Sequence, residues 1–277
     1  MRLGIFAKTF ARPTLEATLG AVRSCGLNVV QFNLSCAGLP TLPDELSAEW
    51  AGAIGRAVQG HGIEMAAISG TFNMIHPDVA QRRAGLRRLA VLAAACGSLG
   101  TRLITLCTGT RDPADMWRRH SDNGSPAAWR DLLESMRQAV RIAEEHDITL
   151  GVEPEVSNVI DSARQARRLL DELASSRVRI VIDAANLFHA GELARMAEVL
   201  DEAFDLLGPD IALAHAKDLV RDGEAGDQAA GSGLLDYRRY LSLLSQAHYG
   251  GPLILHGLSE AEVPRTIERM RALGVSG

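Results

Sequence analysis

Four side chains of the kinds that bind metal ions each follow a short apolar run in the second half of the chain. They are Glu153, Asp183, His215 and His256, and the intervals between them are 30, 32 and 41 residues. Parallel strands that alternate with helices all end at the same edge of their sheet, so side chains at those ends can converge on one ion. The pattern therefore predicts a single divalent metal ion held by these four residues.

Each of the four residues also has an ordinary structural explanation. Glu153 could be a loop carboxylate, Asp183 could cap the following helix, and His215 and His256 could be hydrogen-bonded core residues. All of these explanations would have to apply together, at the ends of four successive strands. A shared metal site is the simpler interpretation.

The strands that must position these residues can be read from eight short apolar or β-branched runs, which longer amphipathic stretches separate. The predicted strands are Leu3–Phe6, Val29–Phe32, Ile63–Ile68, Leu103–Leu106, Thr149–Val152, Val178–Ile182, Ile211–Ala214 and Leu253–Leu255. Eight strand-helix units of about 35 residues each predict an α/β fold, a (β/α)8 TIM barrel that forms a single domain over residues 1–277.

A doubly wound open sheet is the competing architecture. It usually has fewer strands and, where it binds nucleotides, a glycine-rich phosphate loop after the first strand; Ala7-Lys8-Thr9-Phe10 stands at that place instead. Long loops at 69–78, 107–128 and 218–235 each follow a predicted strand. In a barrel they lie on the same face as the four candidate ligands and could form the walls of a pocket.

Composition excludes several classes of function. The formal net charge of −5 disfavours nucleic-acid binding, which depends on clustered lysine and arginine. The chain has no run of about 18 apolar residues and opens directly on a short strand, so we expect a cytoplasmic protein with no membrane partner. Its four cysteines are widely spaced, which suggests neither a zinc knuckle nor a disulfide framework.

Several motifs together resemble a known family. The segments GVEPE, VIDAANLF, LAHAKDL, GSGLLDYRRYLSLL and GGPLILH are similar, in order and strand context, to the sugar phosphate isomerase/epimerase family of xylose-isomerase-like barrels. In that family a Glu, an Asp, a His and a second Glu follow strands five to eight and hold a divalent ion, often manganese. By this resemblance Glu153, Asp183 and His215 take the first three positions.

The fourth position departs from the family pattern, because His256 stands where the family usually has Glu. Two carboxylates and two neutral imidazoles carry less negative charge and more nitrogen than the family set. Such a site favours manganese, iron, cobalt or zinc over magnesium, and manganese is our first expectation. Glu260 is an alternative source of the missing carboxylate.

The resemblance implies proton transfer beside a carbonyl group of a small sugar, ketose or polyol derivative, with an enediolate intermediate. Glu153 is the expected principal base, and in related epimerases the strand-eight glutamate is the second. His256 can take that catalytic role only if it leaves the metal; otherwise the reaction uses one base. Isomerisation and epimerisation are the leading predictions, and β-elimination by a lyase or dehydratase acting on a keto sugar is the nearest alternative.

Six further residues are candidates for contact with substrate. Four lie in the long loops after the predicted third and fourth strands, and the other two follow the predicted sixth and seventh strands; each has a structural alternative such as packing, capping or pairing in solvent. The candidates are His76, Arg111, Trp117, His120, Asn186 and Lys217. For Lys217, one alternative is a solvated pair with Asp218.

Two other classes of protein remain open at this point. An endonuclease of abasic sites shares the barrel but needs more metal ligands and a basic groove, which the acidic balance opposes. A barrel that binds a sugar without turning it over is consistent with the loss of the second carboxylate at His256. Whether the barrel converts a sugar or only binds one, we expect a small carbohydrate as its ligand. The chain could also form a homo-oligomer.

Overall fold

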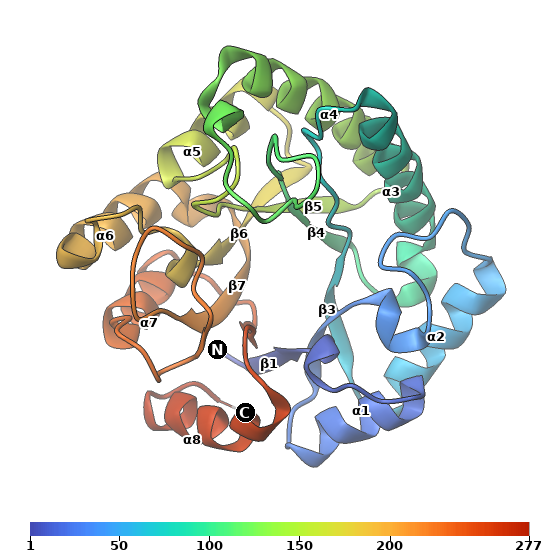
Figure 1. Ribbon diagram of the computed structural model, residues 1–277. Helices are drawn as coiled ribbons and strands as arrows, with labels where there is room; N and C mark the ends of the chain where they lie inside the picture. Colours follow the sequence, from blue (N-terminus) through green and yellow to red (C-terminus); the bar gives the residue numbers. More distant parts are fainter. Residues whose placement is uncertain (277) are drawn as a thin grey trace.

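The computed structural model describes residues 1–276 and shows a closed barrel of eight parallel strands surrounded by eight helices (Figure 1). The strands from β1 to β7 pair in chain order, including β6 with β7. The last barrel strand, β9, pairs with both β7 and β1 and so closes the ring. The barrel strands are β1 Leu3–Phe6, β2 Val29–Phe32, β3 Glu64–Ser69, β4 Leu103–Cys107, β5 Thr149–Glu153, β6 Val178–Asp183, β7 Ile211–Asp218 and β9 Leu253–Leu255. The predicted single-domain TIM barrel is confirmed.

A helix packs outside the barrel after each strand. The helices are α1 Leu15–Ser24, α2 Ala48–Gly60, α3 Val79–Leu99, α4 Pro126–Glu145, α5 Ala163–Leu173, α6 Met196–Leu207, α7 Tyr237–Gln246 and α8 Val263–Ala272. Six of them begin at a serine, threonine or aspartate whose side chain accepts a hydrogen bond from a backbone N–H of the first turn. Such caps satisfy donors that the helix itself cannot.

The strand predictions are correct within one residue at most ends, and the main error lies in β7. We predicted an end at Ala214, whereas β7 continues to Asp218 and pairs antiparallel with a short extra strand, β8, at Gln228–Ala229. His215 and Lys217 are therefore both strand residues. The polar residues after Ala214 hid this extension, because pairing with a distant segment, rather than local pattern, maintains the strand.

The hydrophobic core has two parts. The larger part lies between the helices and the outside of the barrel. The smaller part lies inside the barrel and consists of Val29, Ala67, Val181, Leu213 and Ile254, with Leu103 packed against it. The interior of the barrel is therefore filled with side chains at this level and is no channel.

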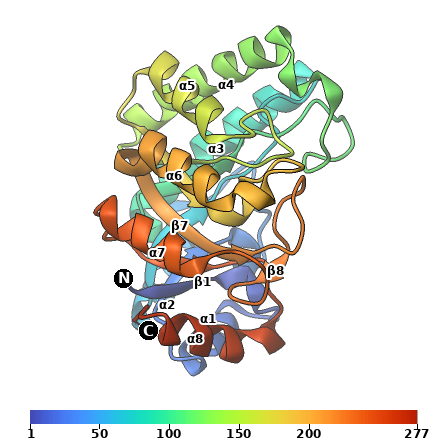
Figure 2. The same cartoon turned by 90° about the vertical axis from the view of Figure 1, so that its left-hand side faces the viewer.

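Figure 2 shows the barrel from the side, with both chain termini at one end and the β8 loop at the other. The long loops at 70–78, 108–125 and 219–236 all follow the carboxyl ends of strands, as predicted. They lie at the end that carries the active site in barrels of this type. Within residues 1–276, no helix is long and apolar enough to cross a membrane.

Candidate active site and metal centre

A layer of polar side chains lies two residues beyond the apolar layer on each of several strands. Gln31 follows Val29, Ser69 follows Ala67 and Thr105 follows Leu103; the other such pairs are Val181 with Asp183, Leu213 with His215 and Ile254 with His256. Side chains two residues apart on a strand point to the same face. The apolar interior and the polar layer are thus consecutive levels of one barrel.

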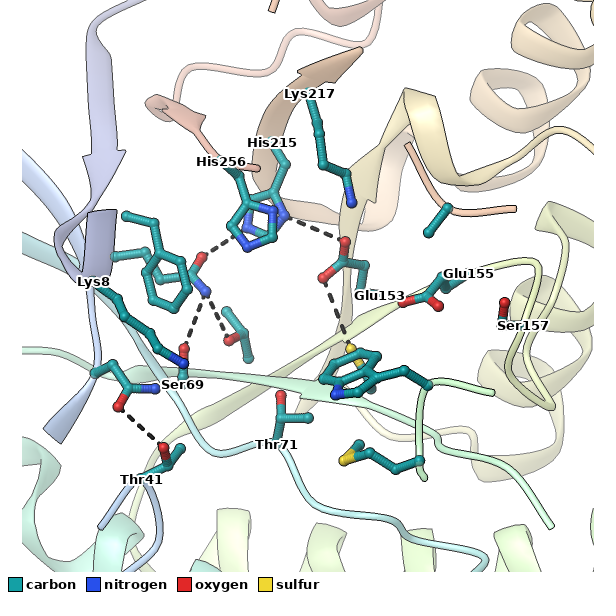
Figure 3. Close-up of a pocket in the computed structure, with 18 of the residues that line it drawn as sticks. Lys8, Thr41, Ser69, Thr71, Glu153, Glu155, Ser157, His215, Lys217 and His256 are labelled. Carbon is teal, nitrogen blue, oxygen red and sulfur yellow. Dashed lines mark hydrogen bonds and ion pairs between the residues drawn. The ribbon is translucent and has the colours of Figure 1, made fainter. Parts of the chain in front are cut away.

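Three of the four predicted ligands come together most closely. Asp183, His215 and His256 each present one ligand atom, and these atoms lie within 4.8 Å of one another. Glu153 adjoins them, with its Oε1 3.4 Å from His215 Nδ1. Figure 3 shows Glu153, His215 and His256 facing a common space.

The hydrogen bonding of this group fits a metal ion. In residues 1–276, Asp183 Oδ2, His215 Nδ1 and His256 Nδ1 are buried and have no hydrogen-bond partner, although Asp183 Oδ2 lies at ion-pair distance from Lys217 Nζ. Leaving one buried polar atom unpaired costs roughly 1–3 kcal/mol, so three in one cluster call for a common partner. A cation that accepts one oxygen and two nitrogen donors would satisfy all three atoms.

Gln31 orients His215 for this purpose. Gln31 Oε1 lies 2.7 Å from His215 Nε2, and its Nε2 donates to Ser69 Oγ and Thr105 Oγ1 at 3.2 Å each. With its amide nitrogen engaged in this way, the Gln31 carbonyl oxygen accepts the proton on His215 Nε2. The lone pair of His215 is then on Nδ1, the atom that faces the cluster.

Glu153 is held at the edge of the cluster. Asn186 Nδ2 donates to its Oε1 at 2.8 Å, and Cys107 Sγ lies 3.9 Å from its Oε2. Burial by itself would raise the pKa of Glu153, but the neighbouring His215 and the Lys217 ammonium group outweigh burial and lower it. Glu153 is therefore a carboxylate, able both to bind a cation and to accept a proton.

Lys217 lies beside the cluster and pairs with Asp183, at 3.4 Å from Nζ to Oδ2. Burial would lower the pKa of Lys217, but the negative charges of Asp183, Glu153 and Glu155 raise it, so the ammonium form is kept. The alternative of a solvated pair with Asp218 is wrong. Asp218 is fully buried and accepts backbone N–H groups of the loop after β7, at Leu219, Gly233 and Leu235.

His256 is half-buried, with its Nδ1 atom buried, and it stacks between two other rings. Its ring centroid is 5.1 Å from that of His215 and 5.2 Å from that of Phe6. Burial and the neighbouring Lys217 and His215 lower the pKa of His256 to about 3, so the ring is neutral with a free lone pair. Glu260 does not replace the missing carboxylate, because both of its oxygens pair with Arg12 on the exposed surface.

The cluster forms one side of a cavity of about 690 Å³. This volume is in the range of small-molecule sites and has room for a sugar. Trp117 and Met116 supply apolar wall, and Glu155 is a second carboxyl group from the end of β5 that faces the space. Burial and the neighbouring charge of Glu153 raise the pKa of Glu155 to about 7.

The structure divides the six predicted substrate contacts. Trp117 and Lys217 line the cavity. Asn186 does not line it but positions Glu153 and accepts the backbone N–H of Gly226 through Oδ1. Asn186 therefore holds the Glu153 carboxylate in place, whereas we predicted that it would contact substrate.

The other three, His76, Arg111 and His120, lie outside the cavity lining and make contacts with the long loops and with α4. His76 Nε2 lies 3.1 Å from Pro113 O, while Nδ1 accepts the N–H of Asp78. Arg111 pairs with Asp131 at 2.6 Å, and His120 caps a short helical turn through Asp122 N–H. Polar residues in a long loop satisfy the loop's own backbone as readily as they meet a ligand.

Sequence reasoning missed Gln31, Glu155 and Lys8, which also line the cavity. Gln31 could have been found from its place in the strand Val29–Phe32, since an amide within an apolar strand predicts a buried hydrogen-bond network. Glu155 follows Glu153 by two residues, the spacing that returns a side chain to the same face of an extended chain. Lys8 gave no local signal.

Comparisons with known proteins agree with this geometry. The barrel is similar to the apo structure of 3-keto-D-glucoside 4-epimerase YcjR from E. coli, with a TM-score of 0.73, 17% identity and coverage of 98% of this chain and 99% of that one. It is also similar to the IOLI protein with a bound zinc atom, with a TM-score of 0.74, 16% identity and coverage of 98% and 97%. At these identities the likeness concerns the fold.

The sequence itself carries a closer relationship. It is 26% identical over 151 residues to the ketose 3-epimerase of Arthrobacter globiformis, and the match covers 52% of this chain and 48%, about half, of that relative. A family model described as xylose isomerase-like TIM barrel matches residues 19–273. With nearly the whole barrel matched, the chain belongs to the xylose isomerase-like TIM barrel family.

Proposed function

We propose that this protein is a metal-dependent isomerase or epimerase of a small ketose or keto sugar, with Glu153 as the base. The observation that carries the proposal is the convergence of three buried ligand atoms, on Asp183, His215 and His256, that have no hydrogen-bond partner within residues 1–276 and lie beside a carboxylate at the wall of a sugar-sized cavity. The family and the ketose 3-epimerase relative support the reaction class.

The residues that would hold the ion are Asp183, His215 and His256, with Glu153 next to them. One oxygen and two nitrogen donors favour manganese, iron, cobalt or zinc over magnesium, and we propose manganese. When bound, the ion would supply positive charge that stabilises the oxygen anion formed when a proton is lost beside a carbonyl group.

The protein groups perform the proton transfer. Glu153 Oε1 is held by Asn186, so the carboxylate keeps one orientation while it takes the proton. The Lys217 ammonium group, 3.4 Å from Asp183, adds a fixed positive charge near the place where negative charge develops. Trp117 lines the cavity with apolar surface that can lie against a sugar ring.

The identity of residue 256 favours reactions that need one base. Nδ1 of His256 is one of the ligand atoms, so this ring would be occupied by the metal ion and is not a free base. Glu260, the nearby carboxylate in the sequence, pairs with Arg12 and does not take over that role. Aldose-ketose isomerisation needs only one base, and so does elimination from a keto sugar, which makes a lyase the second candidate. Epimerisation would need a second group on the opposite face of the substrate.

Two measurements test the proposal. We expect the purified protein to bind one equivalent of Mn²⁺ by calorimetry and, with Mn²⁺, to convert a member of a panel of ketoses and keto sugars, with NMR distinguishing isomer, epimer and elimination product. Glu153→Gln should lower turnover by about 10²–10⁴-fold while leaving the circular dichroism spectrum unchanged.

Glu198→Gln on α6, an exposed position, is the matched control and should retain full activity. A wild-type protein that binds no divalent ion would contradict the metal centre. Full activity in Glu153→Gln would remove this residue from the mechanism.

A further inference from the structure

The chain is unusual in its use of lysine. Of 29 lysine and arginine residues, only Lys8 and Lys217 are lysines. Both line the same cavity. Everywhere else on the protein positive charge is supplied by arginine, so the compact ammonium group is confined to the place where a ligand would bind.

The two lysines differ in their surroundings. Lys217 is buried and neutralised by Asp183. Lys8 follows β1, and its side chain extends toward the part of the pocket that carries Ser69 and Thr71 (Figure 3). Lys8 is exposed, and within residues 1–276 its ammonium group makes no hydrogen bond and no ion pair.

The charges of the cavity are segregated between its two walls. The wall from β5, β7 and the loop after β7 carries Glu153, Glu155, Glu224 and Lys217. Among residues 1–276, the wall from β1, β2 and β3 carries one charged residue, Lys8, among neutral groups. The second wall therefore offers an anion a positive charge that no carboxylate of that wall neutralises.

The neutral groups around Lys8 also present hydrogen-bond donors. Asn33 Oδ1 is occupied by the N–H of Ser35 and the hydroxyl of Thr41, which leaves the NH₂ group of the Asn33 side chain for a ligand. Ser69 Oγ accepts from Gln31, so its own O–H is free to donate. An ammonium group, an amide NH₂ and a hydroxyl are together suited to an anionic oxygen.

We propose that the substrate carries an anionic group, a carboxylate or a phosphate ester, and that Lys8 binds it on the β1–β3 wall. The inference deepens the proposed function and rests on it for the sugar nature of the ligand. Binding at Lys8 fixes the direction of the substrate, because it holds the charged end at this wall and directs the carbonyl end toward Glu153. Lys8 is therefore the residue that selects acidic sugars over neutral ones.

A matched series of ligands tests this in the Mn²⁺-loaded protein. D-fructose, D-fructuronate and D-fructose 6-phosphate differ at one end only, and their affinities can be measured by calorimetry without any turnover. We expect at least one of the two anions to bind 10-fold or more tightly than fructose. Lys8→Met should weaken that anion about 10- to 100-fold, as expected for loss of a charge-assisted hydrogen bond, and change fructose less than twofold.

Two controls separate recognition from general electrostatics. Lys8→Arg keeps the charge and should retain most of the preference, and Arg56→Met, which removes a positive charge from the exposed surface of α2, should leave it unchanged. The rarity of lysine allows a second readout. Reductive methylation can label only Lys8, Lys217 and the amino terminus, and the bound anion should protect Lys8 in a mass-spectrometric count.

The outcomes are distinct from those of the proposed function. Equal affinity for fructose and both anions, or unchanged anion affinity in Lys8→Met, overturns the role of Lys8 even if the protein isomerises a neutral ketose. Lys8-dependent binding of an anion supports the role even if that ligand is not turned over. A preference for fructuronate identifies a carboxylate, and a preference for fructose 6-phosphate identifies a phosphate ester.

Discussion

Two neighbouring levels of the barrel interior have opposite character. The lower level, with Val181, Leu213 and Ile254, is apolar and tightly packed. The upper level, two residues further along the same strands, holds Asp183, His215 and His256, with three buried atoms that have no hydrogen-bond partner in residues 1–276. Stability comes from the first level and chemistry from the second, and only one pleat of each strand separates them.

The largest expected effect comes from placing a charge in the apolar level. Leu213→Asp puts a carboxylate among Val181 and Ile254, where nothing pairs with it. The cost is several kcal/mol, about 3–5 or more, against a total stability of roughly 5–15 kcal/mol. We expect a loss of soluble folded protein, measured by yield and by urea unfolding.

Leu213→Met is the control for that change, since it keeps volume and apolar character and should cost less than about 1.5 kcal/mol. A folded Leu213→Asp protein with unchanged unfolding midpoint would show that water reaches this level and that the two levels are not distinct.

The second prediction places an apolar side chain in the polar level. His256→Leu removes the unpaired Nδ1 and fills the space with apolar atoms. We expect the metal-free protein to unfold at the same temperature as the wild type or higher, because a buried unsatisfied group is gone. The rise in Tm on adding Mn²⁺ should disappear, with metal affinity reduced at least about 100-fold.

His248→Asn is suited as the control, because His248 is exposed and has a positive φ of 55°, which asparagine tolerates. It should leave the metal-induced shift intact. Unaltered Mn²⁺ affinity in His256→Leu would exclude this residue as a ligand.

A smaller effect is expected from the group that orients a ligand. Gln31→Leu removes the acceptor at 2.7 Å from His215 Nε2 and frees the imidazole to change tautomer. Loss of such an outer partner usually lowers metal affinity about 10- to 100-fold, and calorimetry with Mn²⁺ measures it. Gln31→Glu keeps the acceptor and should retain most of the affinity; an equal loss in both variants would argue against orientation as the cause.

The smallest effect concerns packing between the levels. A Cβ at Gly151 would lie 2.7 Å from Val181 Cγ2 and 3.3 Å from Leu103 Cδ1. Gly151→Ala should therefore destabilise the protein by about 1–3 kcal/mol, measured by urea unfolding. Gly20→Ala in α1, where nothing lies within 4 Å, should instead stabilise it by roughly 0.5–1 kcal/mol. Stabilisation by both substitutions would mean that the apolar level has free space.

Part of the candidate site could be predicted because strand ends are local features. Glu153, Asp183, His215 and His256 each follow an apolar run, and parallel strands bring such positions to one edge whatever the details of packing. The loop residues could not be predicted in this way. His76, Arg111 and His120 bind backbone and carboxyl groups of their own loops, and no pattern in the sequence distinguishes that use from contact with a ligand.

By itself the sequence determined the eight strands, the barrel and the four residues at its carboxyl end, since alternation of strand and helix is a periodic, local property. Only the tertiary structure decided that Gln31 orients His215 across 184 residues, that Asn186 holds Glu153, and that Lys8 and Lys217 line one cavity. These contacts depend on how the ring closes and which side chains then face each other. Closure joins segments that are far apart along the chain, and local pattern does not encode such distances.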